Sequence, residues 1–128
     1  MNGMSVLAVG SGAALGAWLR WGLNLILNPL FPNLPLGTLA ANLVGGLLMG
    51  CAMGVMAQYE NLPPELRLFV TTGFLGGLTT FSTFSAESVT LLLRDQWGWA
   101  LAHSVAHLCG ALLAVIAGLA LMRLLLRA

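Results

Sequence analysis

Charged residues are scarce in this chain, and one kind is absent altogether. Of its 128 residues 7% are charged and 59% are hydrophobic, and the five basic residues are all arginine, with no lysine. A soluble domain carries about 25% charged residues, so water is not the solvent for most of this surface. So few basic residues also exclude a nucleic-acid interface. The composition indicates an all-α membrane protein in contact with the lipid bilayer.

Cysteine and the common enzyme motifs are also missing or rare. The only two cysteines, Cys51 and Cys109, lie in apolar stretches, where unpaired buried thiols are expected rather than a disulfide. The sequence contains no nucleophile with its base and no phosphate-binding glycine loop. It therefore gives no indication of an enzyme.

Long apolar runs are what the sequence has instead. At about 20 residues per crossing, these runs predict four transmembrane helices in a single domain, residues 1–128. Proline-rich turns at residues 28–35 and 60–65 and a short polar turn at 94–96 separate the runs. The expected helices are Met4–Leu27, Pro35–Gln58, Leu66–Leu93 and Trp97–Leu126.

The third predicted helix contains the most unusual stretch, Gly73-Phe-Leu-Gly-Gly-Leu-Thr-Thr-Phe-Ser-Thr-Phe-Ser85. Glycine and threonine are poor helix formers, so the helix is expected to break here. Backbone groups freed in hydrocarbon cost several kcal/mol each unless protein, water or an ion satisfies them. The stretch therefore predicts a mid-membrane break that builds an ion site.

Two phenylalanines, Phe81 and Phe84, follow the expected break one helical turn apart. Such pairs most often serve core packing. A phenyl edge, however, is electropositive and can contact an anion where water is scarce. The positive end of the restarted helix points to the same place. An anion pathway and plain packing both stand as interpretations, and the neighbouring hydroxyls favour the pathway: Thr79, Thr80, Ser82, Thr83 and Ser85.

Asn42 lies in the second predicted helix on a stripe of small residues. The stripe comprises Thr38, Asn42, Gly46, Gly50 and Gly54, at every fourth residue. Small residues at this spacing allow close helix packing, and an asparagine can join helices by hydrogen bonds. An amide also offers two N–H donors without a charge, which suits a passing anion. The spacing alone fits both roles.

Two charged side chains fall well inside predicted helices, away from the helix ends. Arg20 continues a first-helix stripe with Gly12 and Gly16, and it must pair, snorkel or face water because burial in lipid costs at least ~2.5 kcal/mol. A snorkelling arginine and a vestibule charge that attracts anions are both open. Glu87 is the one carboxylate in a predicted span. A structural acceptor capped by nearby hydroxyls is the favoured interpretation, and a charged functional group is the alternative.

His103 and His107 in the fourth predicted helix have metal-ligand spacing. The sequence shows no HExxH pattern and no third ligand at a suitable spacing, which disfavours a zinc site. The histidines are expected to be hydrogen-bonded membrane residues or donors beside a polar route.

The arginines outside the first helix give little preference for one orientation. Three lie toward one membrane face, Arg67, Arg123 and Arg127, and Arg94 lies toward the other. Both orientations are therefore expected. Four short helices also enclose little volume, and their small-residue stripes offer packing faces. These features predict an antiparallel, dual-topology homodimer.

Three segments resemble the small bacterial Fluc-type (CrcB) fluoride channels. They are Gly16-Ala-Trp-Leu-Arg-Trp21, Gly37-Thr-Leu-Ala-Ala-Asn42 with Gly45, and Gly73 to Phe84. The resemblance runs from the first to the fourth predicted helix. It implies a passive, fluoride-selective channel of the bacterial inner membrane that protects the cell from fluoride. It further implies two pathways in an antiparallel homodimer.

The same resemblance implies roles for individual residues. Phe81 and Phe84 would form an aromatic box, Asn42 would donate to fluoride, and side chains including Thr80, Ser82, Thr83 and His107 would line the route. A structural sodium ion would lie at the dimer centre, held by the backbone carbonyls of Gly76 and Thr79 from both copies.

Two rival functions differ in class. A small multidrug-type, proton-coupled exporter is also four-helical, but it needs a carboxylate in the first helix, where this chain has Arg20 and no acid. A non-transporting assembly protein would leave the hydroxyls and phenylalanines as packing. Fluoride efflux from liposomes discriminates between these functions and a channel.

Overall fold

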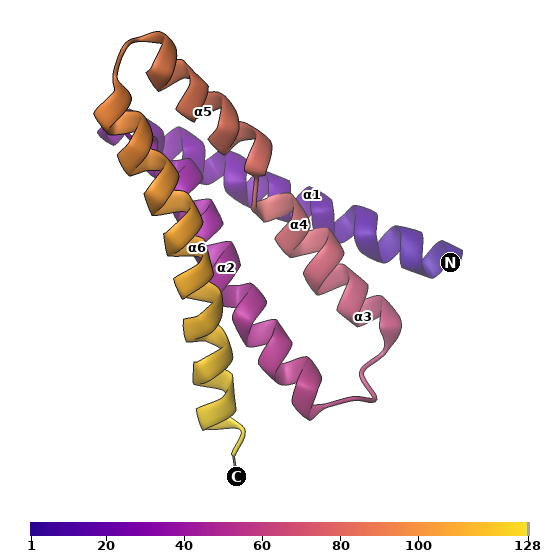
Figure 1. The fold of residues 1–128 in the computed structure, drawn as a ribbon. Helices are drawn as coiled ribbons and strands as arrows, with labels where there is room; N and C mark the ends of the chain where they lie inside the picture. Colours follow the sequence, from indigo (N-terminus) through magenta and orange to yellow (C-terminus); the bar gives the residue numbers. More distant parts are fainter. Residues whose placement is uncertain (128) are drawn as a thin grey trace.

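The computed structural model describes residues 1–127, and within them the regular elements are all helices (Figure 1). The all-helical fold class is therefore confirmed. In chain order the elements are α1 (Gly3–Leu27), the short 3-10 turn η1 (Asn28–Leu30), α2 (Leu36–Gln58), α3 (Pro64–Leu68), the π-helix η2 (Phe69–Leu75), α4 (Gly76–Leu78), α5 (Phe81–Leu93) and α6 (Trp97–Leu125).

Three of these helices are long and apolar enough to cross a membrane: α1 with its η1 extension, α2 and α6. Their bounds match three of the predicted helices to within one residue at each end. The 25 residues of α1 extend about 38 Å at about 1.5 Å per residue, which exceeds a hydrocarbon core of about 30 Å. Such a helix fits the bilayer by tilting.

The third predicted helix is instead a chain of shorter pieces, α3, η2, α4 and α5. The expected break is confirmed and lies at Thr79 and Thr80, whose backbones are extended (φ −88°, ψ 155° and φ −150°, ψ 120°). Gly76 and Gly77, by contrast, are helical. Threonine hydroxyls compete for backbone groups, and here they supply the bonds that end one helix and start the next.

The glycines of the third segment and of α1 serve close packing. A Cβ atom on Gly12 would stand 2.5 Å from the carbonyl oxygen of Phe69 and 3.1 Å from the Cα of Gly73. A Cβ on Gly16 would collide with the carbonyl of Phe74. The absence of side chains thus lets α1 lie directly against η2 and α4.

The α2 stripe is used in the same way against α6, which runs beside it (Figure 1). A Cβ on Gly50 would collide with the carbonyl of Val115, and a Cβ on Gly118 with that of Leu47. The stripes were expected to offer faces to a second copy. That expectation is wrong for these glycines, because they are buried between helices of one chain.

The junction between α2 and the third segment holds the small core. Ala41, Leu75 and Leu78 are almost fully buried there, with Leu23 and Phe74 packed around them. Beyond the break, α5 leads to a tight turn and the chain returns as α6 (Figure 1). Asp95 occupies the left-handed region in this turn (φ 56°). The break therefore sits where α2, α5 and α6 converge.

Candidate ion site at the helix break

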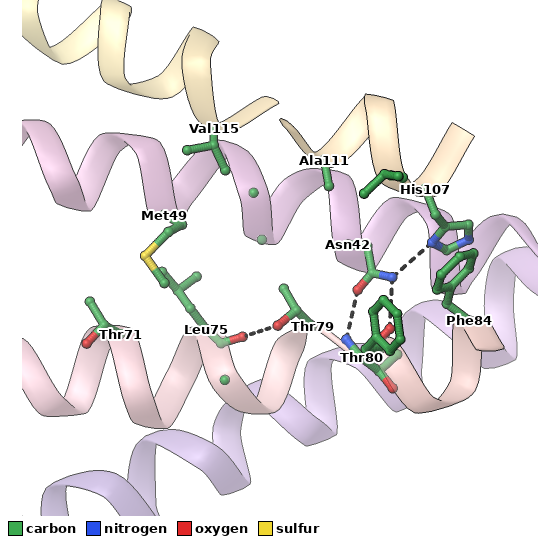
Figure 2. A pocket seen from close by; sticks show the side chains of 15 residues that line it. Asn42, Met49, Thr71, Leu75, Thr79, Thr80, Phe84, His107, Ala111 and Val115 are labelled. Atoms are coloured by element: carbon green, nitrogen blue, oxygen red, sulfur yellow. Dashed lines mark hydrogen bonds between the residues drawn. The ribbon is translucent and has the colours of Figure 1, made fainter. Parts of the chain in front are cut away.

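One asparagine side chain satisfies the backbone of the break (Figure 2). The Thr80 amide donates to Asn42 Oδ1 at 2.8 Å, and Asn42 Nδ2 donates to the Thr80 carbonyl at 3.0 Å. Thr80 in turn caps α5, since its Oγ1 accepts from the Thr83 amide at 3.1 Å. Both backbone groups of Thr80 and the amide of Thr83 are thus paired with protein, as hydrocarbon requires.

The second N–H of Asn42 lies 2.9 Å from Nδ1 of His107 (Figure 2). The backbone N–H of Thr80 needs an acceptor, and only the side-chain oxygen of Asn42 can accept it. The orientation of the Asn42 side chain is therefore fixed, and its nitrogen is the donor to His107. Nδ1 of His107 is therefore an acceptor, and the neutral ring carries its proton on Nε2. That Nε2 is buried and has no hydrogen-bond partner among residues 1–127.

The two phenylalanines have different environments. Phe84 stacks on His107, with ring centroids 4.7 Å apart, and on His103 at 5.3 Å. Phe81 meets Phe84 edge to face at 5.4 Å, but 77% of its surface is exposed. Core packing therefore accounts for Phe84 in part and does not account for Phe81 within one chain.

A cavity of about 370 Å³ lies beside the break. Five of the predicted pathway residues line it: Asn42, Thr80, Phe81, Phe84 and His107. The predicted cation residues Gly76 and Thr79 line it too. Sequence reasoning missed several other wall residues, among them Met49 and Thr71 (Figure 2). Helical spacing from Asn42 and from Thr79 was the available signal for these two.

The hydroxyls of Ser82 and Thr83 are not brought into this cavity. Ser82 is exposed, with its Oγ 3.4 Å from Oγ1 of Thr80, and Thr83 is half-buried on α5. Arg20 is also outside, where its Nε donates to the Gly77 carbonyl at 3.0 Å. Arg20 thus pairs with the backbone at the end of α4 rather than only snorkelling toward water.

Glu87 lies one turn further along α5 and joins three helices. Thr38 Oγ1 of α2 donates to its Oε2 at 2.7 Å, and Nε2 of His103 lies 3.1 Å from its Oε1. Ser88 Oγ lies 2.7 Å from the other ring nitrogen of His103. Glu87 is therefore hydrogen-bonded by a hydroxyl, as expected, and also by a histidine.

The sequence shows no third ligand at a suitable spacing from the two histidines, but the fold brings a carboxylate close to them. Ligand atoms of Glu87, His103 and His107 all lie within 4.8 Å of one another. The carboxylate comes from α5 and the histidines from α6, so spacing along one helix could not show the group.

Two carbonyls at the break lose their helical donors. The Thr80 amide would bond the Gly76 carbonyl in a continuous helix, but it donates to Asn42. The Thr83 amide would likewise bond the Thr79 carbonyl, but it donates to Thr80 Oγ1. Gly76 and Thr79 thus offer backbone oxygens of the kind that bind sodium.

Comparison with known proteins identifies relatives of this chain. The family model described as "CrcB-like protein, Camphor Resistance (CrcB)" matches residues 7–119. A protein of Nitrosospira multiformis named fluoride-specific ion channel FluC is 61% identical over 90% of each chain. Proteins of the same name from Aromatoleum aromaticum (60%, 84% of this chain and 82% of the relative) and Cupriavidus pinatubonensis (56%, 98% and 99%) are also similar.

The relatives and the three apolar helices place this chain in a lipid membrane. It is a multi-pass integral membrane protein, which in a bacterium resides in the inner membrane. The family model covers most of the chain, and the relatives match it nearly from end to end. The chain therefore belongs to the CrcB family.

Proposed function

We propose that this protein is a fluoride-selective channel that lets fluoride leave the cell passively. The relatives named fluoride-specific ion channels support the substrate. The observation that carries the proposal is the Asn42 amide at the break, which shares one cavity with Phe81, Phe84 and His107. The protein moves an ion and is not an enzyme.

Fluoride would meet Asn42 on the side that faces His107. Asn42 bonds both backbone groups of Thr80, and these bonds satisfy the broken backbone. Its remaining N–H bonds only a ring nitrogen of His107, which another acceptor can replace. An anion can accept this N–H in place of His107 while the break stays intact. An uncharged donor replaces part of the hydration shell without trapping the ion.

The aromatic rings would give fluoride its next contacts. Phe81 and Phe84 meet edge to face. The edge of a phenyl ring carries partial positive charge, which attracts an anion. Ser82 and Thr83 lie outside the cavity of one chain, and we place them on the outer part of the route. Thr80 and His107 belong to its inner part, beside Asn42.

We further propose that the segment Pro64–Leu93 crosses the membrane as a fourth, broken helix and that two copies pair antiparallel. Phe81 is 77% exposed and Gly76 is exposed at the cavity wall, so one chain leaves this wall incomplete. A second copy related by a two-fold axis would complete it and give two pathways. Single cysteines placed at residue 60 or 95 should react with an impermeant reagent from both sides of the membrane, and strictly one-sided labelling would contradict the dual topology.

The carbonyls of Gly76 and Thr79 would hold a structural sodium ion at the dimer centre. Both are freed by the break, and a two-fold axis would bring four such oxygens together. Bound there, the ion would supply positive potential close to the anion route. Fluoride flux should fall when purified dimer is stripped of sodium, and undiminished flux without sodium would contradict this role.

The multidrug-type exporter is not supported. The first helix, Gly3–Leu27, contains no carboxylate, and its one charge pairs with the carbonyl of Gly77. The channel proposal is tested in a bacterial strain that lacks its own fluoride exporter. Expression of this chain should restore growth in millimolar fluoride, and failure despite membrane insertion would contradict it.

A further inference from the structure

Glu87, His103 and His107 form a cluster of possible metal ligands that the proposed fluoride route does not account for. Its ligand atoms lie within 4.8 Å of one another, and both histidines are buried. His107 Nε2 has no hydrogen-bond partner among the described residues, although its ring lines the cavity. A buried, unpartnered ring nitrogen beside a second imidazole and a carboxylate needs an explanation.

We propose that these three side chains bind one zinc ion, or a similar divalent transition-metal ion, that reaches them through the cavity. Two imidazoles and one carboxylate are a donor set that zinc accepts, with a fourth position left for water or an anion. Hard cations such as magnesium prefer sites built from oxygen alone, so they are not expected here.

The side chains need only small movements to coordinate an ion. Ligands about 2.0–2.1 Å from a tetrahedral zinc lie roughly 3.3 Å apart. His103 Nε2 and Glu87 Oε1 are already 3.1 Å apart. His107 sits four residues after His103, one helical turn away, with ring centroids 4.5 Å apart. Closing the site therefore requires a rotation of the His107 ring rather than movement of a helix.

Metal binding and the Asn42 contact compete for His107. Zinc on Nε2 displaces the ring proton to Nδ1, where Asn42 now donates an N–H. Two donors then face each other, and Asn42 cannot turn over because its oxygen is held by the Thr80 amide. The metal would therefore push the ring away from Asn42. If the fluoride route proposed above is correct, the bound ion interrupts it.

Binding is measured on the purified protein without reference to transport. The tag is removed, and Cys51 and Cys109 are changed to serine so that thiols do not contribute. Zinc titration by calorimetry should give one site per chain, and cobalt should give the visible absorption of a low-coordinate nitrogen and oxygen site. Loss of a residue that only hydrogen-bonds a metal ligand costs about 10–100-fold in affinity. Loss of a direct ligand should cost more, so Glu87→Gln and His103→Gln should each weaken binding by about a hundredfold or more.

Glu60→Gln is the matched control, since it removes an exposed carboxylate in the turn after α2. Absence of saturable zinc binding, or equal binding in both ligand variants and the control, overturns the proposal. Variants that lose the gel-filtration peak are excluded. If both ligand variants are lost in this way, the cobalt spectrum of the protein that keeps Glu87, His103 and His107 decides whether the metal site exists. Fluoride efflux, normalised to each variant without metal, should be blocked by zinc in the control and not in Glu87→Gln. A protein that binds zinc but never conducts fluoride refutes the channel and leaves the metal site standing.

Discussion

The two ends of the α2 and α6 pair are built from opposite materials. Toward the C-terminal end of α2, Gly50 and Gly54 lie against Val115 and Met122 with no room for a Cβ. Toward its N-terminal end, Thr38 and Asn42 reach polar partners on other elements, at Glu87, Thr80 and His107. The same two helices thus make a dry, close-packed contact at one end and a hydrogen-bonded cavity at the other.

The difference shows what each material provides. Glycines bring backbones together, where contact and dispersion stabilise the pair without any directional bond. Polar side chains satisfy backbone groups of a broken helix and offer hydrogen-bond donors at one place. The packed end sets the distance between the helices, and this distance places polar side chains of the other end around the cavity. Changes at the polar end should therefore alter transport, and changes at the packed end should alter stability.

The largest effect is expected from Asn42→Asp. The carboxylate keeps an acceptor for the Thr80 amide but removes both N–H donors and places a negative charge on the route. Fluoride efflux from liposomes should fall by about a hundredfold or more, a barrier rise of ~2.7 kcal/mol. The gel-filtration profile should not change. Wild-type flux in this variant would reduce Asn42 to a cap of the break.

The phenylalanines should give the next largest effect. Isoleucine keeps much of the buried surface but has no electropositive edge, so Phe81→Ile and Phe84→Ile should each lower fluoride efflux about tenfold, or ~1.4 kcal/mol. Phe81 is mostly exposed in one chain, so its variant should lose flux with little loss of thermal stability of the chain. Phe84 stacks on both histidines, so its variant should lose flux and thermal stability. Near-normal flux in both variants would return the rings to a packing role.

The packed end is tested by Gly50→Ala, where the smallest effect on transport is expected. The new methyl would collide with the Val115 carbonyl and stand 2.7 Å from the Leu119 amide, so unfolding should become easier by about 1–3 kcal/mol. Flux per folded molecule should hardly change. Gly10→Ala is the matched control, because nothing lies within 4 Å of its new Cβ and alanine favours the helix. Equal melting temperatures of the two variants would contradict the close contact.

The sequence predicted those features that depend on local patterns. Apolar runs gave the long helices, and the glycine and threonine stretch gave the break, because both follow from spacing along one chain. The π-helix at Phe69–Leu75 was not predicted, since its bonds shift register without a change in composition. The stripes showed that helices pack closely but not against which partner, and they pack within the chain.

The candidate site was predictable only where one residue carried the signal. Asn42, Phe81 and Phe84 stand out as polar or aromatic residues at the break, and they do line one cavity. The Glu87 and His103 contact joins two helices across a turn, so no spacing in the sequence indicates it. Ser82 and Thr83 shared the same local pattern yet lie outside the cavity, because on α5 they lie off the helix face that carries Phe81 and Phe84.

Selective transport tests the central claim most directly. Liposomes that contain the purified protein are loaded with equal fluoride and chloride, and the release of each ion is followed with its own electrode after the membrane potential is dissipated by an ionophore. We predict rapid fluoride release and chloride release no faster than from protein-free liposomes. Retention of fluoride by the protein-containing liposomes, or release of both ions at similar rates, would contradict a fluoride-selective channel.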